Sequence, residues 1–167
     1  EMNRQDVHFG LVGGGTSLPE MQALAAELQI ADYVTFTGRV SDDELLDMLN
    51  TADVCVNPDV ANEMNDKSTM NKIMEYMALG KPIVQFDLSE GRFSAQEASL
   101  YAAKNDPQDM ARKLVELLDD PERRARMGAY GRNRVENELE WKYEAPKLLA
   151  AYEAMFEGKV SLRETAV

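Results

Sequence analysis

The sequence predicts an α/β fold in which a mostly parallel sheet is sandwiched by helices. Three observations support this prediction. Short apolar segments alternate with segments of helical periodicity along most of the chain. Glycine, proline or capping residues stand where one kind of segment gives way to the other. The apolar segments are nearly continuous, which is typical of strands that are buried on both faces of a parallel sheet.

The first part of the chain contains two strand–helix repeats. Each begins with a short apolar run, VHFGLV and then YVTF, and continues into a segment with apolar residues at helical spacing. The second helix is expected to start at Ser41, because Glu44 three residues later completes a capping-box pattern. The predicted strands cover 7–12 and 33–36, and the predicted helices cover 18–29 and 41–52.

The second part starts with the apolar run DVCVNP, and a polar loop of roughly ten residues leads from it to a methionine-rich helix. Gly80 is expected to end that helix in a left-handed conformation, directly before the strand PIVQF. A polar segment rich in small residues and the short apolar run SLYA then precede three helices. The predicted strands cover 53–58 and 82–86, the small-residue segment 89–99, and the helices 69–79, 107–119, 121–137 and 140–157.

Composition limits the class of protein. The chain of 167 residues has the size of one domain, which we place at 1–157 with a tail at 158–167. Its formal net charge of −12 argues against binding nucleic acid or an anionic membrane nonspecifically, so a phosphate site would have to be local. The single cysteine, Cys55, is expected to be a buried thiol in a reducing, cytoplasmic setting. Because the chain starts with Glu1, we expect processing or a fragment of a longer protein.

Four loops are expected at the carboxyl edge of the sheet, where ligands bind in such folds. The first contains Gly13, Gly14 and Gly15, whose lack of side chains would let the backbone approach a ligand. The glycines do not form a G-x-G-x-x-G motif, because Leu18 occupies the third position, and a plain tight turn is the alternative. The four loops cover 13–17, 38–42, 57–69 and 85–94.

Lys67, Ser68 and Thr69 place a positive charge and two hydroxyls before the predicted helix 69–79. The free N–H groups of a helix start favour an anion, most simply a phosphate. The alternative is ordinary capping by one of the hydroxyls, with the lysine in solvent.

Glu75 lies inside the same helix, in a segment otherwise composed for burial, so we expect its carboxylate to have a partner. That partner could be a pair of sugar hydroxyls. The alternative is a surface pair with Lys72 one turn earlier.

Hydrolytic and zinc chemistry are disfavoured. The only histidine, His8, stands at the start of a strand and is expected to be structural. No Ser/His/Asp or Cys/His set can be assembled from the sequence. The acidic pairs Asp42-Asp43 and Asp119-Asp120 fall at helix ends, where caps and solvated turns are the expected roles.

These segments together resemble a known family, the retaining glycosyltransferases of group 1 (family four), in the C-terminal domain that binds the donor nucleotide. KIMEYMALGKPIV is similar to the family's most specific signature. The run from FGLVGGGT to ADVCVNP follows the family's order of strands, glycine loop and helices. The closing segment, including Trp141, resembles its final helices.

The resemblance implies a Rossmann-like domain, the C-terminal half of a GT-B fold whose first strand and helix are missing here. It also implies that an N-terminal acceptor domain is absent, so that this chain alone would be inactive. The full-length protein would transfer a hexosyl group, with retention, from a nucleotide diphosphate sugar to a glycan or lipid-linked acceptor in polysaccharide biosynthesis. It would need no metal or cofactor, bind no nucleic acid, and be cytoplasmic or peripheral to the membrane.

The resemblance also assigns roles to single residues. Glu75 matches the glutamate that contacts the ribose, while the family's other glutamate, which contacts the transferred sugar, falls on Lys67. A lysine cannot accept hydrogen bonds, so its implied role is to supply charge to the diphosphate or sugar. The diphosphate would lie at 68–70 and the base near Arg39 and Val40. The implied site is Gly13, Gly14, Gly15, Arg39, Val40, Lys67, Ser68, Thr69, Met70, Asn71, Lys72 and Glu75.

Two other functions are carried as alternatives. One is a non-catalytic Rossmann-like binding or receiver module, although a receiver needs an acidic cluster where Gly13 to Gly15 stand. The other is a sugar-nucleotide epimerase of the same two-domain architecture. An epimerase would use carboxylates and a histidine in these loops, and His8 is badly placed for that.

Overall fold

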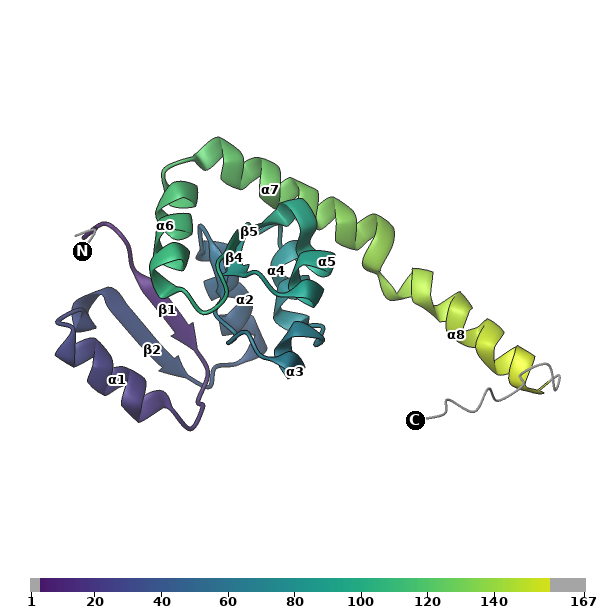
Figure 1. Cartoon of the computed structure of the whole chain (residues 1–167), viewed down its shortest axis with the longest axis horizontal. Helices are drawn as coiled ribbons and strands as arrows, with labels where there is room; N and C mark the ends of the chain where they lie inside the picture. The colour runs from purple at the N-terminus through teal and green to yellow at the C-terminus, as the bar shows by residue number, and fades with distance from the viewer. Residues whose placement is uncertain (1–3, 157–167) are drawn as a thin grey trace. The chain divides into compact units, whose positions relative to one another are not determined.

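The computed structural model describes residues 4–156, so the expected tail at 158–167 lies outside the described residues. Parallel strands covered by helices confirm the predicted α/β class. The chain divides into two compact units, Glu1–Ala52 and Asp53–Val167. The strands form two sheets, one in each unit, where the sequence analysis expects one (Figure 1).

The first unit is a two-stranded parallel sheet with two helices. In Figure 1, α1 lies along β2 on the side away from β1. All four residues of β1 are exposed, so the expected burial on both faces is wrong for this strand, because a pair of strands with few helices cannot cover it. The elements are β1 (Phe9–Val12), α1 (Leu18–Glu27), η1 (Ala31–Tyr33), β2 (Val34–Gly38) and α2 (Asp42–Thr51).

The predicted start of α2 is confirmed in detail. Ser41 accepts a hydrogen bond from the backbone N–H of Glu44 at 3.3 Å. The Glu44 carboxylate in turn accepts from the backbone N–H of Ser41 at 2.9 Å, which completes the capping box. Two free N–H groups at the helix start are therefore satisfied by a pattern that the sequence alone displays.

The second unit contains a three-stranded parallel sheet in the order β3-β4-β5. Its central strand, β4, is buried along its whole length, as the sequence predicts. Because side chains alternate along a strand, Val84 and Phe86 join one apolar cluster and Ile83 joins a second. Helices α6 (Pro107–Leu118) and α7 (Pro121–Arg134) contribute to the first cluster, and α4 (Asn71–Ala78) and α5 (Ser89–Ala95) contribute to the second. The strands are β3 (Cys55–Asn57), β4 (Ile83–Phe86) and β5 (Ser99–Ala102).

The segment between β3 and β4 differs from the prediction. A short helix, α3 (Glu63–Asp66), forms inside the expected loop, and its N-cap Asn62 accepts from the N–H of Asn65 at 2.8 Å. Helix α4 (Asn71–Ala78) starts two residues later than predicted. The hydroxyl residues that suggested an earlier start make contacts elsewhere.

The small-residue segment is helical over 89–98 rather than a loop, and its last residue, Ser99, begins β5. It forms α5 (Ser89–Ala95) and a 3-10 turn, η2 (Gln96–Ala98). Its small residues allow close packing on the sheet: a Cβ on Gly91 would lie 2.5 Å from the side-chain oxygen of Gln85 on β4. The small residues therefore suggested a loop, although their role is to let a helix approach a strand closely.

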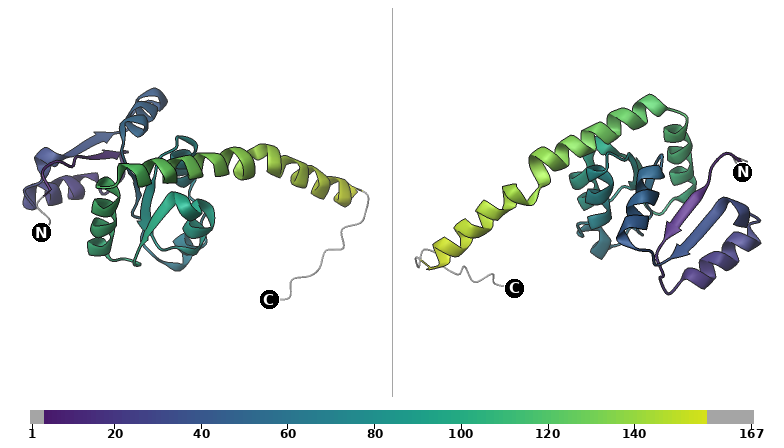
Figure 2. Two further views of the ribbon diagram at one scale, coloured as in Figure 1. Left: turned by 90° about the horizontal axis from the view of Figure 1, so that it is seen from above. Right: turned by 180° about the vertical axis from the view of Figure 1, so that it is seen from behind.

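The three C-terminal helices are present with shifted ends. They are α6 (Pro107–Leu118), α7 (Pro121–Arg134) and α8 (Trp141–Phe156), with a π-helical stretch η3 (Val135–Leu139) in place of the predicted end of α7. Figure 2 shows α8 continuing from α7 away from the rest of its unit, and none of the residues of α8 is buried. Among residues 4–156, no helix combines the length and the apolar character that crossing a membrane requires.

The end of α4 is held against α7 by a contact between two glycines. Gly80 has φ +67°, which confirms the predicted left-handed end of the helix. Directly beside it lies the backbone of Gly128 in α7, where an added Cβ would come within 2.0 Å of the Gly80 carbonyl oxygen. Helix α4 can therefore lie this close to α7 only because Gly128 has no side chain, whereas a Cβ on Gly80 would make an ordinary contact with the Gly128 carbonyl oxygen at 3.7 Å.

Candidate functional site

In the first unit, the glycine loop and the turn after β2 lie together. The N–H of Gly13 donates to the carbonyl of Gly38 at 2.9 Å, and both residues have positive φ. A Cβ on Gly14 would lie 3.8 Å from the backbone nitrogen of Arg39. The structure thus brings the predicted residues Gly13 to Gly15 and Arg39, with its neighbour Val40, to the carboxyl end of one strand pair.

A hollow of about 230 Å³ borders the glycine loop. Gly13 and Gly15 form part of its wall, and a Cβ on Gly15 would meet no atom within 4 Å. The hollow's other walls are mainly apolar. The backbone of this loop is therefore open to a ligand, as the glycines suggested. The remaining lining residues are Leu11, Val12, Ser17, Leu18, Met21 and Phe36.

In the second unit, the three polar residues before α4 are engaged with the protein. Lys67 pairs with Glu63 at 2.9 Å, and its side chain is 73% exposed. The hydroxyl of Ser68 donates to the carbonyl of Met64 at 2.6 Å. The hydroxyl of Thr69 donates to the Glu90 carboxylate at 2.7 Å. Neither hydroxyl caps α4, so the alternative of ordinary capping is wrong on this point, whereas Lys67 is exposed as that alternative expects.

Helix α4 begins without a side-chain cap. Its N-cap residue is Met70, whose side chain makes no capping hydrogen bond, and no acidic residue stands in the first turn. The thioether of methionine is a weak acceptor, so the first-turn N–H groups of Asn71 and Lys72 remain available as hydrogen-bond donors to an oxygen or an anion. The structure therefore leaves a helix start that favours negative charge.

Glu75 is exposed and lies one turn after Asn71 on the same exposed side of α4. The alternative, a surface pair with Lys72, is wrong, because Lys72 instead donates to Asp59 after β3 at 2.8 Å. The burial from which a partner for Glu75 was expected is also absent, so its carboxylate can be hydrated by water. Its negative charge contributes, after burial, to raising the pKa of the adjacent Tyr76 to about 12.

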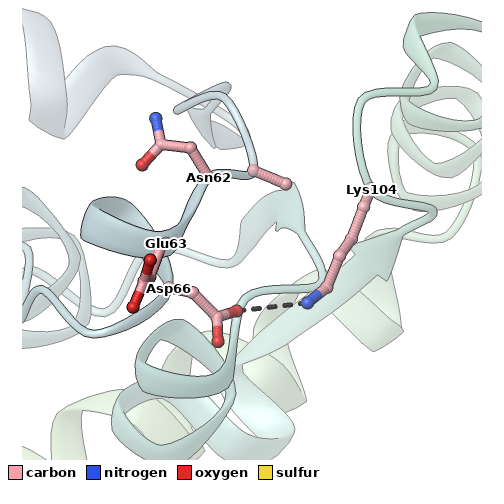
Figure 3. Close-up of a pocket in the computed structure, with 5 residues that line it drawn as sticks. Asn62, Glu63, Asp66 and Lys104 are labelled. Atoms are coloured by element: carbon pink, nitrogen blue, oxygen red, sulfur yellow. Dashed lines mark hydrogen bonds and ion pairs between the residues drawn. The ribbon is translucent and has the colours of Figure 1, made fainter.

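Asp66 joins three segments around a polar hollow of about 230 Å³ (Figure 3). Its carboxylate accepts from the N–H and the hydroxyl of Ser89 at 3.0 and 2.8 Å, and from Lys104 after β5 at 3.2 Å. The hydrogen bonds from Ser89 are the main cause that lowers the pKa of Asp66, and Lys104 adds to their effect. Together they bring this pKa to about 2. The hollow is also lined by Ala61, Asn62 and Glu63.

Sequence reasoning missed the residues that hold this region. Asp59, Glu90 and Lys104 each bind one of the predicted site residues or Asp66, yet they come from three separate segments: the loop after β3, helix α5 and the turn after β5. Their only sequence signal is their place shortly after a strand or at a helix start. The expected structural role of His8 is supported by its hydrogen bond with Thr35 at 2.8 Å. Within the described part of the chain, no group of three potential ligands could hold a metal ion.

Comparisons with known proteins point to one family. A family model described as "Glycosyl transferases group 1" matches residues 1–120. The chain is 28% identical over 148 residues to a GDP-mannose-dependent monoacylated alpha-(1-6)-phosphatidylinositol monomannoside mannosyltransferase of Corynebacterium glutamicum. The matched residues make up 87% of this chain and 38% of that protein. The chain is 33% identical over 146 residues to a D-inositol 3-phosphate glycosyltransferase of Thermomonospora curvata, with 86% and 32% covered. The chain thus spans less than two fifths of the length of these relatives.

The fold has counterparts among solved structures. A glycosyltransferase from Rickettsia africae matches with a TM-score of 0.79 and 16% identity, over 90% of this chain and 40% of that one. A sucrose-phosphate synthase from Thermosynechococcus elongatus matches with a TM-score of 0.74 and 24% identity, over 89% of this chain and 38% of that one. At these identities the likeness shows the fold alone.

Proposed function

Because the chain belongs to the group 1 glycosyl transferases, we propose that it is the donor-binding domain of an enzyme that transfers a sugar from a nucleotide diphosphate sugar to a glycan or lipid-linked acceptor. We propose further that the anomeric configuration is retained and that the reaction needs no metal or cofactor. The acceptor would be bound by a part of the enzyme that this chain does not include, as its coverage of 38% of a relative suggests.

The uncapped start of α4 is the observation that supports this proposal most strongly. A diphosphate needs donors and positive charge, and the first turn of a helix supplies both through its N–H groups and its dipole. Met70 offers no competing oxygen to these groups. Lys67 is nearby in the chain, and its exposed pair with Glu63 can be exchanged for a phosphate at little cost.

The structure refines the roles that the resemblance implied. The hydroxyl protons of Ser68 and Thr69 are already donated to protein oxygens. Either hydroxyl would have to rotate before it could donate to a phosphate, so we assign the main phosphate contacts to the backbone N–H groups of Asn71 and Lys72. Glu75, exposed on the same face of α4, is assigned to the ribose hydroxyls, for which a carboxylate is a suitable acceptor.

The proposal is tested by titrating the chain with UDP, GDP and ADP while its amide signals are followed by NMR. We expect binding in the millimolar range, with the largest shifts at the amides of Asn71 and Lys72. Glu75→Gln should weaken binding roughly threefold to tenfold, because a charged acceptor makes a stronger hydrogen bond than an amide.

The matched control is Glu27→Gln, which neutralises an exposed glutamate at the far end of α1 and should leave affinity unchanged. Absence of binding by all three nucleotides at millimolar concentration would count against a donor site. Shifts confined to residues outside α4 and the loop before it would likewise place the nucleotide elsewhere and contradict the assignment.

A further inference from the structure

We propose that the turn between β5 and α6 is a positioning clamp for the donor loop, the segment 57–70 that leads into α4. Its positioning residues are Asn105 and Lys104, and Lys104 acts through Asp66 of the loop. The inference rests on the proposed function, since it concerns the same loop. In the sequence, Lys104 and Asn105 stand shortly before the predicted helix 107–119. In the structure, the turn makes contacts at two points of the donor loop.

The first contact is made by Asn105. Its side-chain oxygen accepts from the N–H of Ala61 at 2.7 Å, and its side-chain nitrogen donates to the carbonyl of Ala61 at 3.1 Å. One amide side chain thus satisfies both backbone groups of a single residue, which fixes the loop's position and direction at that point. Asn105 has φ +58°, a conformation that asparagine tolerates better than most residues, and this conformation is part of the turn.

The second contact is made through Asp66. Lys104, the neighbour of Asn105, reaches its carboxylate at 3.2 Å, and Figure 3 shows the two side chains pointing toward each other across the hollow. Ser89 at the start of α5 binds the same carboxylate through two hydrogen bonds. Asp66 therefore ties the end of α3 to both the turn and the start of α5.

These contacts bracket α3 directly before the residues assigned to the ligand. Ala61 precedes α3 and Asp66 ends it, so the short helix is anchored at both ends. A helix of four residues has little stability of its own. Without the clamp, α3 and the following residues Lys67 to Thr69 should sample several positions, and only a fraction of molecules would present the loop to a nucleotide.

The test compares Asn105→Gly with wild type by NMR-detected amide exchange. Glycine keeps the positive φ but removes both hydrogen bonds to Ala61. If the turn positions the whole loop, the amides of Asn65 and Asp66 should exchange roughly tenfold faster, although Asn105 touches neither. If the effect is local, only the amide of Ala61 will respond, and this result would overturn the proposal.

Two further variants sharpen the comparison. Gln29→Gly is the matched control, because Gln29 also has positive φ, +56°, but lies in the first unit. It should leave exchange in α3 unchanged. Asp66→Asn keeps the size of the side chain but removes the charge that attracts Lys104, and it should speed exchange in α3 less than Asn105→Gly. Equal exchange in wild type and both clamp variants would also overturn the proposal.

Nucleotide affinity separates positioning from a structural role. With whichever of UDP, GDP and ADP binds wild type, Asn105→Gly should bind about threefold to tenfold more weakly at a temperature where both proteins are fully folded. Unchanged affinity in this variant contradicts a positioning role. If wild type binds none of the three, the proposed function fails, and the exchange of Asn65 and Asp66 alone decides whether the clamp exists.

Discussion

The contact between Gly80 and Gly128 gives the sharpest stability prediction. In Gly128→Ala, the new methyl group would lie 2.0 Å from the carbonyl oxygen and 2.9 Å from the carbonyl carbon of Gly80. Both atoms belong to the backbone, so no side chain can rotate away. Restoring ordinary contact at 3.4 Å or more requires α4 and α7 to separate by about 1.4 Å at this point.

The magnitude follows from two opposing effects. Overpacking a rigid contact costs roughly 3 kcal/mol or more, at the upper end of the usual range, because backbone must move. Alanine in place of glycine inside a helix stabilises the helix by about 1 kcal/mol. We therefore expect Gly128→Ala to lower the free energy of unfolding by about 2 to 3 kcal/mol. With a typical urea dependence, the unfolding midpoint falls by about 1 M or more.

Urea unfolding followed by far-UV circular dichroism measures this loss, and Gly131→Ala one turn along α7 is the matched control. A Cβ at Gly131 would meet the Cβ of Ala98 at 3.0 Å and Cγ and Cβ of Met77 at 3.1 and 3.3 Å, so these neighbours would have to shift by only a few tenths of an ångström. Its cost should be within about 1 kcal/mol, partly offset by helix propensity. The reasoning is refuted if Gly128→Ala is as stable as wild type, or if Gly131→Ala is the more destabilised variant.

Three further predictions concern single groups. Ser41→Ala should cost about 1 kcal/mol of unfolding free energy by removing the capping box with Glu44, and an unchanged urea midpoint would contradict this. Burial raises the pKa of the Cys55 thiol to about 11, so an aromatic disulfide reagent at neutral pH should react with it only after urea unfolding; rapid reaction of the folded chain would show that the thiol is accessible. The pKa of Asp66 is lowered from 3.8 to about 2, so its ionised form stabilises the fold above pH 3.8, and this contribution is lost as the pH falls through about 2. Asp66→Asn should therefore be least stable relative to wild type near neutral pH. A stability difference between the two proteins that stays constant down to about pH 2 would contradict this prediction.

Much of the secondary structure could be predicted because its causes are local. The capping box of Ser41 and the left-handed Gly80 are properties of a few neighbouring residues, and both are confirmed. Prediction failed where a distant partner decided the conformation. Helix α5 resembled a loop in the sequence because it contains small residues, which allow it to pack closely on β4. Thr69 resembled a helix cap because its actual hydrogen-bond partner, Glu90, lies far along the chain.

The candidate site shows the same division. The sequence by itself determined the family resemblance, the glycine loop and the helix that carries Asn71 and Glu75, since these depend on residue type and spacing. Only the tertiary structure decided that Lys72 binds Asp59 rather than Glu75, and that Asn105 and Lys104 hold the donor loop. The physical reason is that a polar side chain takes whichever partner the fold brings within about 3 Å, and sequence distance does not set that choice.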